Sequence, residues 1–243
     1  EAGHLQPFVT SVLGLISVNT PTDAILGRDA ERDIHVRRRR RDTLAIQSMS
    51  TPEAIRSHVM ALDGVRSLQF LENYTDSPQT IRGVLLKKNS IWVCVDGGED
   101  REIAESIFRI KTNGAGYNGS VQVDITDPRS QVPYPVNFDR PVEKAILIRV
   151  TVRHSIFDAQ NLVPDLVMNY VNGDIEGDRS FEVGVDVSPW EIAGAINQQE
   201  PRLSVVKVEL SEVGTGVWST DVFAVDINEL AKTQRSSISV IET

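Results

Sequence analysis

Two apolar runs separated by a long polar segment constrain the fold of this chain most. Val65–Leu71 and Ile91–Val95 carry apolar residues at near-alternating spacing, the pattern of β-strands. The second run leads into the turn Gly97-Gly98, after which Glu99–Lys111 has isoleucines at helical spacing. The sequence therefore predicts an α+β fold, in which helices pack on small mixed or antiparallel sheets.

A helix is predicted just before the first strand. Ser50 or Thr51 can cap its start, and Pro52 suits the first helical position. Gly64 is placed to end it. Between the two strands, Tyr74–Ser90 is predicted to be a long loop, and long loops in compact domains usually serve a function or move.

A hairpin and an amphipathic strand are predicted next. Val121–Ile125 and Tyr134–Phe138 pair as a hairpin, and Ala145–Val152 alternates apolar with polar residues. Such alternation gives a strand one packed face and one wet face.

The last ninety or so residues partly repeat this plan. A helix is predicted at Phe157–Val171, and Ser188-Pro-Trp-Glu191 matches a capping box at the start of another. Strands are predicted at Leu203–Leu210, Val217–Val225 and Ser236–Ile241. The sequence therefore predicts two related α/β units, over residues 50–153 and 154–243, preceded by an N-terminal arm over residues 1–49.

The predicted arm is partly extended and partly helical. From Gly27 the pattern turns helical, with acidic residues first and Arg37–Arg41 near the end, the order that a helix dipole favours. The chain opens at Glu1 without a methionine, so we expect an upstream part to be missing.

Composition argues against several classes of function. The formal net charge of -9 is unlike the basic footprint of a nucleic-acid-binding protein, and acidic residues bracket the Arg37–Arg41 run. No stretch approaches the roughly 20 apolar residues that a membrane span needs. We therefore expect neither nucleic acid nor membrane as a partner.

Three motifs invite a chemical interpretation, and each has a structural one. Gly114–Gly119 spells G-x-G-x-x-G, but it follows a predicted helix and precedes a strand, which is the wrong context for binding a phosphate. Asn172–Asp178 half-matches a calcium loop, yet the required twelfth-position glutamate falls on Val183. The single cysteine, Cys94, lies inside a predicted strand.

No catalytic or metal-binding pattern stands out elsewhere. The four histidines share no metal-ligand spacing, and there is no G-x-S-x-G elbow. Carboxylates are plentiful, but a sequence does not show which two converge, so a hydrolytic pair is neither supported nor excluded. The sequence predicts no cofactor, no metal and no small-molecule substrate, and we expect that the chain is not an enzyme.

Several motifs in a fixed order carry a resemblance to a known family. They are Asn19-Thr-Pro-Thr-Asp23, Gly27-Arg-Asp-Ala-Glu-Arg-Asp33 with Arg37-Arg-Arg39, Gly64-Val65 with Glu72-Asn73, Ile91-Trp-Val-Cys-Val-Asp-Gly-Gly98 with Glu102-Ile-Ala104, Gly114–Gly119, and Val136-Asn-Phe-Asp-Arg-Pro141. In their order and spacing the chain resembles the baseplate J-like family of contractile phage tails, from about Asn19 to its end.

The resemblance implies a structural role. Members of that family are wedge proteins that join into a ring around the baseplate hub, so the expected partners are further copies of this chain, as a dimer or ring, and other tail proteins. The expected location is the tail baseplate of a virion, and the host cytoplasm during assembly. The alternative is a tail-associated cell-wall hydrolase. The predicted subunit-interface residues are Arg37, Arg38, Arg39, Arg40, Arg41, Glu72, Asn73 and Tyr74.

Overall fold

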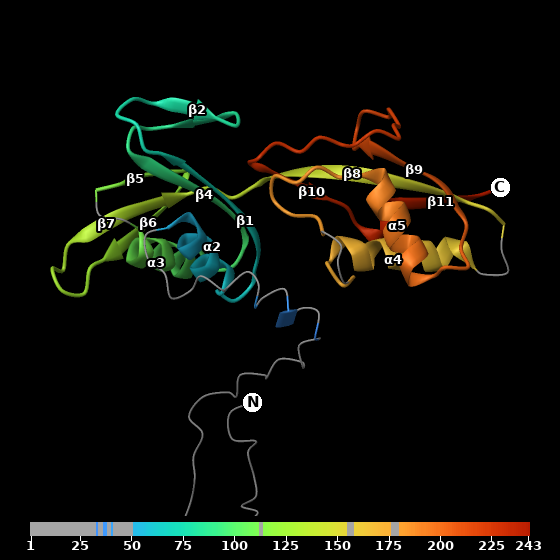
Figure 1. Ribbon diagram of the computed structural model, residues 1–243, viewed down its shortest axis with the longest axis horizontal. Coiled ribbons are helices and arrows are strands. Elements are labelled where there is room, and N and C mark those ends of the chain that lie inside the picture. The colour runs from blue at the N-terminus through green and yellow to red at the C-terminus, as the bar shows by residue number, and fades with distance from the viewer. Residues whose placement is uncertain are drawn as a thin grey trace, which may run out of the picture. The chain divides into compact units, whose positions relative to one another are not determined.

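A computed structural model describes residues 51–111, 114–154, 158–175 and 180–243, and also Asp33, Val36, Arg37 and Arg40. The chain divides into a unit Glu1–Asp33 and a larger unit Ile34–Thr243, and every helix and strand below belongs to the larger one. These elements form an α+β fold, as the sequence predicts (Figure 1). The rest of the arm, with its predicted helix from Gly27, lies outside the described residues.

The first sheet has the strand order β1-β4-β5. Strand β1 (Val65–Asn73) pairs antiparallel with β4 (Ser90–Gly97), and β4 pairs parallel with the short β5 (Gly116–Asn118). Both strands predicted from the apolar runs are therefore confirmed, and each is slightly longer than predicted.

Strand β4 is covered on both faces, which explains why its apolar run is nearly continuous. Ile91, Val93 and Val95 face a core that includes helices α2 (Pro52–Met60) and α3 (Asp100–Ile110). Trp92 and Cys94 face a second, smaller core. That smaller core also contains Leu71, Leu86, Val183, Ile227 and Leu230, so segments from far along the chain cover this face of the first sheet.

Helix α2 begins as its sequence predicts. Pro52 is its first residue, and the Thr51 hydroxyl accepts a hydrogen bond from the amide of Ala54 at 3.1 Å. The helix ends at Met60, so the prediction that Gly64 ends it was wrong; Gly64 lies beyond the helix with φ of +75° and helps the chain turn into β1.

The predicted loop Tyr74–Ser90 contains a hairpin, so this prediction was wrong. Strands β2 (Gln79–Ile81) and β3 (Val84–Leu86) pair antiparallel around the turn Arg82-Gly83. Both turn residues have positive φ, +48° and +85°, as a type I′ hairpin turn requires. Three-residue strands are too short to show a periodic pattern, and arginine is unusual at such a turn.

A second hairpin was predicted correctly. Strands β6 (Val121–Thr126) and β7 (Pro133–Phe138) pair antiparallel over their whole lengths. The chain then continues from Phe138 to Asp139, whose backbone forms a parallel bridge beside Cys94. That bridge ties the second hairpin to β4.

The second sheet is built around the long strand β8 (Val142–Val152). Strand β9 (Val205–Glu212) pairs antiparallel with it on one side, while β10 (Glu229–Lys232) and β11 (Ile238–Glu242) pair parallel with it on the other. Residues 145–152 are thus hydrogen-bonded to strands of the C-terminal part, although the predicted boundary assigned them to the first unit. The predicted extents of the units are not otherwise tested.

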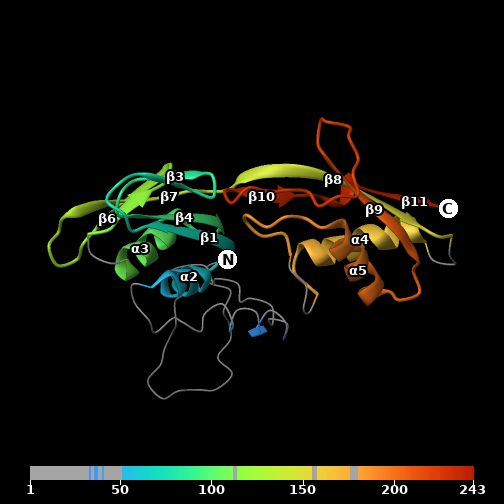
Figure 2. The same cartoon turned by 45° about the horizontal axis from the view of Figure 1, so that its top comes forward.

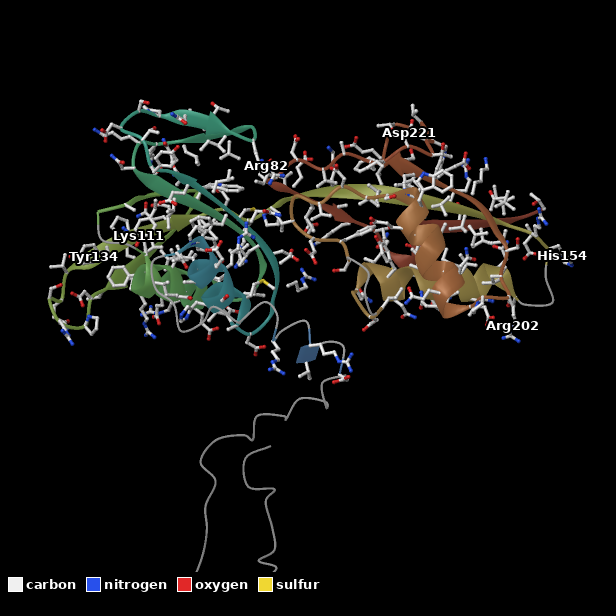
Figure 3. All side chains as sticks on the ribbon, in the orientation of Figure 1. Arg82, Lys111, Tyr134, His154, Arg202 and Asp221 are labelled. Carbon is white, nitrogen blue, oxygen red and sulfur yellow. The ribbon has the colours of Figure 1, made fainter. Side chains whose placement is uncertain are left out.

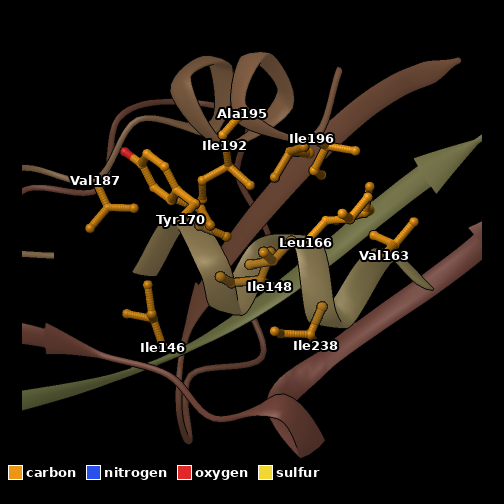
Figure 4. Packing of buried hydrophobic residues seen from close by; sticks show 14 of the residues in the cluster. Ile146, Ile148, Val163, Leu166, Tyr170, Val187, Ile192, Ala195, Ile196 and Ile238 are labelled. Carbon is orange, nitrogen blue, oxygen red and sulfur yellow. The ribbon is translucent and has the colours of Figure 1, made fainter. Parts of the chain in front are cut away.

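Helices α4 (Ala159–Val171) and α5 (Pro189–Gln199) lie on the same face of the second sheet (Figure 2). The buried side chains of β8, including Ile146 and Ile148, meet Leu166 and Tyr170 of α4 and Ile192 of α5 (Figure 4). The alternation seen in the sequence therefore marks the face that the helices cover, as predicted.

Three predictions for the C-terminal part were wrong in detail. Val217–Val225 forms no strand and contributes only isolated bridges at Ser219 and Phe223. Strand β10 was not predicted. The predicted capping box does not form, since Ser188 makes no side-chain cap and the Glu191 carboxylate instead accepts a hydrogen bond from the Tyr170 hydroxyl at 3.1 Å.

Candidate functional site

The predicted arginine-rich interface is only partly described. Arg37 and Arg40 are helical and exposed, whereas Arg38, Arg39 and Arg41 lie outside the described residues. Two exposed positions do not establish a surface, so the role of Arg37–Arg41 stays a prediction.

The second predicted group, Glu72, Asn73 and Tyr74, does not behave as one surface. Glu72 and Tyr74 are exposed, but Asn73 is only 1% exposed. The Asn73 amide nitrogen donates to the carbonyls of Ser77 at 2.8 Å and Lys87 at 2.9 Å. Asn73 therefore closes the base of the β2–β3 hairpin within its own chain.

Arg140 is the centre of the densest polar arrangement in the first sheet. Its guanidinium donates to the carbonyls of Val95 at 3.0 Å and Gly98 at 2.8 Å, and also to the carbonyl of Gly97. It also forms an ion pair with Asp100, near the start of α3. One side chain thus holds the end of β4, the Gly97-Gly98 turn and the first turn of the following helix.

Asp139, the neighbour of Arg140, fixes the other side of β4. Its carboxylate accepts from the Trp92 indole at 2.5 Å and from the amide and hydroxyl of Ser120, each at 2.7 Å. Its backbone amide donates to Val93 O at 2.8 Å, and its carbonyl accepts from Val95 N at 3.0 Å. Asp139 therefore aligns β4 with the end of β7 and the start of β6.

Asn118 joins the same strand from β5. Its amide nitrogen donates to the Ser90 hydroxyl at 2.7 Å and the Ile91 carbonyl at 2.9 Å, and its side-chain oxygen accepts from the Lys87 amide at 3.0 Å. A buried amide satisfied in this way fixes where β4 begins.

Two glycines in this region have no room for a side chain. A Cβ on Gly97 would lie 2.1 Å from the carbonyl oxygen of Gly64, and its φ is +79°. A Cβ on Gly119 would lie 2.3 Å from the Phe138 carbonyl carbon, and its φ is +138°. Both glycines are needed because backbones approach each other closely there.

The G-x-G-x-x-G motif serves this packing. As predicted, it follows helix α3 and leads into a strand, because Gly116–Asn118 forms β5. None of its glycines opens a helix, so its amides do not meet a helix N-terminus as a phosphate site requires.

We call these residues together the Arg140 junction: Trp92, Gly97, Gly98, Asn118, Gly119, Asp139 and Arg140. The sequence motifs that carry the family resemblance between 91 and 141 meet in it. The sequence indicated the motifs but not their pairing, since the contacts between Trp92 and Asp139 and between Arg140 and Gly98 span more than forty residues.

Cys94 lies in the interior of β4, as predicted. Its side chain is fully buried, and burial together with the nearby Asp139 carboxylate raises the pKa of the Cys94 thiol to about 12. A thiol with so high a pKa is a poor nucleophile at neutral pH.

Alkaline pH is expected to destabilise the fold. Burial raises the pKa values of Cys94 and Tyr117 to about 12, above their ordinary values of 9.0 and 10.0. The stability that these groups contribute is therefore fully present below about pH 9 and is lost as pH rises towards about 12. Urea unfolding measured at several pH values checks this, and a constant free energy of unfolding across that window would contradict it.

Tyr117→Phe is the matched variant for this effect. The Tyr117 hydroxyl is buried without a hydrogen-bond partner in the described part of the chain, so removing it is expected to leave stability unchanged or higher at neutral pH. The alkaline loss should become smaller.

The remaining candidate motifs add no described site. The half-match to a calcium loop reaches into residues 176–179, outside the described part. Among the residues that are described, no three His, Cys, Asp or Glu side chains are grouped to hold a metal ion. The described helices are all too short or too polar to cross a membrane.

Comparisons with known proteins do not assign this chain. No family model matches the sequence, and no curated protein matches it.

Proposed function

We propose that this chain is a structural component of a contractile tail baseplate, of a phage or a phage-like particle. In this proposal it acts by binding further copies of itself and neighbouring tail proteins, and it performs no catalysis. Its place of action would be the baseplate, after assembly in the host cytoplasm.

One observation carries the proposal. The motifs on which the family resemblance rests are used for backbone geometry, because the polar groups of Asp139 and Arg140 bind the chain's own carbonyls, amides and side chains. A site for chemistry would instead leave polar groups directed at a substrate. Residues that fix a rigid scaffold suit a part whose function is to hold neighbours in place.

Immunogold electron microscopy of contractile tails tests the proposal. Antibodies raised against the chain should label the end of the tail where the baseplate lies, and pre-incubation of the antibody with the purified chain should remove the label. Labelling of the sheath or capsid alone, or no labelling of intact tails, would contradict the proposal.

A peptidoglycan assay tests the hydrolase alternative separately. The purified chain is expected to release no soluble fragments from cell walls, with a known muramidase as the positive control. Sustained release of fragments, lost on substitution of a carboxylate of the chain, would replace the structural role with an enzymatic one.

A further inference from the structure

The two halves of the described chain differ strongly in charge. Between residues 142 and 243 acidic side chains outnumber basic ones two to one, whereas between residues 50 and 141 the two signs nearly balance. A charge difference between two regions of one chain allows one copy to attract another.

The β2–β3 hairpin carries an exposed surface that is basic and apolar. Tyr74 is 83% exposed and Leu85 is 69% exposed. Arg82, Lys87 and Lys88 are also exposed, and in the described structure none of the three forms an ion pair. We call these five residues the hairpin surface; Figure 3 labels Arg82 at its turn.

The Arg82 backbone adds a second indication. Arg82 has φ of +48° in a turn where asparagine or glycine is preferred. A side chain other than glycine in this conformation costs about 1 kcal/mol. Backbone strain retained at an exposed turn is typical of a residue kept for a contact.

A second exposed surface, acidic and apolar, lies at the start of α5. Trp190 is 71% exposed and Val222 is 53% exposed. Asp186, Glu191 and Asp226 are exposed beside them, and no ion pair involves these three carboxylates in the described ranges. We call these five residues the Trp190 surface.

Backbone pairing holds the two segments of the Trp190 surface together. Val187 and Phe223 exchange hydrogen bonds of 3.0 and 2.8 Å, and the Asp186 carboxylate accepts from the Val225 amide at 2.8 Å. The residues on either side of this bridge are therefore neighbours. Figure 3 labels Asp221, which precedes Val222 on the same segment.

We propose that the hairpin surface of one copy of this chain binds the Trp190 surface of a second copy. Charge complementarity selects this occupant, because three unpaired cations would face three unpaired carboxylates, and exposed apolar side chains lie among both sets. The contact rests on the proposed function and specifies which surfaces would join the subunits.

Such a contact is head to tail. The two surfaces differ in composition, so each copy keeps one unused surface after a single contact and can bind a further copy. A contact of this type produces rings where the rotation closes and open chains where it does not. Trp190 is the expected energetic centre, because exposed tryptophans at interfaces commonly carry most of the binding energy.

Two single substitutions test the contact in the full chain. Leu85→Glu places a carboxylate on the hairpin surface, and Trp190→Glu places one on the Trp190 surface. Both positions are exposed, so the fold should tolerate them, and circular dichroism checks that it does. Val217→Glu is the control, because Val217 is 70% exposed and belongs to neither surface.

Sedimentation velocity supplies the measurement. The unaltered chain and Val217→Glu are expected to associate as concentration rises, and less so at high salt. Leu85→Glu alone and Trp190→Glu alone should associate at least about tenfold more weakly. An equimolar mixture of the two should form a one-to-one dimer, since each variant supplies the surface that the other lacks.

Other outcomes would overturn the contact. These are an unaltered chain that stays monomeric at every concentration, variants that associate as the unaltered chain does, or a mixture that forms no heterodimer. If tails are still labelled by the antibody in such a case, the contact is wrong and the proposed baseplate role stands. Arg82→Asn provides a further check, with higher thermal stability and weaker association expected together.

Discussion

A Gly97→Ala variant is expected to lose about 4 kcal/mol of its free energy of unfolding, which is a large part of the stability of an ordinary domain. The new Cβ would lie 2.1 Å from the carbonyl oxygen of Gly64, and both partners are backbone. No side-chain rotation can relieve that overlap, so the turn between β4 and α3 must move. The positive φ of Gly97 adds further strain for alanine.

Gly114→Ala is the matched control for this effect. Gly114 also has positive φ, +90°, but a Cβ there would meet nothing within 4 Å. Its substitution should cost about 1 kcal/mol, from the backbone conformation alone. Urea unfolding of both variants separates overlap from conformation, and equal losses would show that the close approach of Gly97 to Gly64 is unimportant.

An Arg140→Ala variant is expected to lose about 3 kcal/mol. Removing the guanidinium leaves the Val95, Gly97 and Gly98 carbonyls without this donor, and Asp100 without its ion-pair partner. Hydrogen bonds to a charged donor contribute about 1.5–3 kcal/mol each when buried, and partial exposure here reduces their sum.

Two further variants separate geometry from charge. Arg140→Lys keeps the charge but cannot reach several carbonyls at once, so it should lose more than half as much as Arg140→Ala. Arg109→Ala removes an exposed arginine paired with Glu105 at 3.7 Å, and it should change stability by less than about 0.5 kcal/mol. If Arg140→Lys were as stable as the unaltered chain, the fork of hydrogen bonds would not be the cause.

Local patterns in this sequence predict local structure well. Helix α2 follows from Thr51 and Pro52, and the two-sided burial of β4 follows from its nearly continuous apolar run. Each of these signals depends on residues close together in the chain, and the structure confirms them.

Partners far apart in the sequence were not predictable. Strand β8 could have joined either sheet, and its pairing with β10 and β11 joins residues about ninety apart. Strand β10 itself, Glu229–Lys232, is too short and too polar to show a strand pattern.

The same limit applies to the candidate site. The motif containing Asp139 and Arg140 is readable in the sequence, but its target, the end of β4, is not. Asn73 illustrates the opposite error, because a polar residue beside an exposed segment suggested a surface while its amide is buried in the hairpin base. Whether a polar side chain faces solvent or its own chain is decided by tertiary packing.

Hydrogen exchange on the unaltered chain and on Arg140→Ala tests most directly whether the Arg140 junction fixes the backbone of the first sheet. Amides of β4 and β5, with those of Ser120 and Asp139, are expected to lose more protection than the amides of β8 and β9. Unchanged protection in β4, or an equal loss in both sheets, would contradict the role assigned to Arg140.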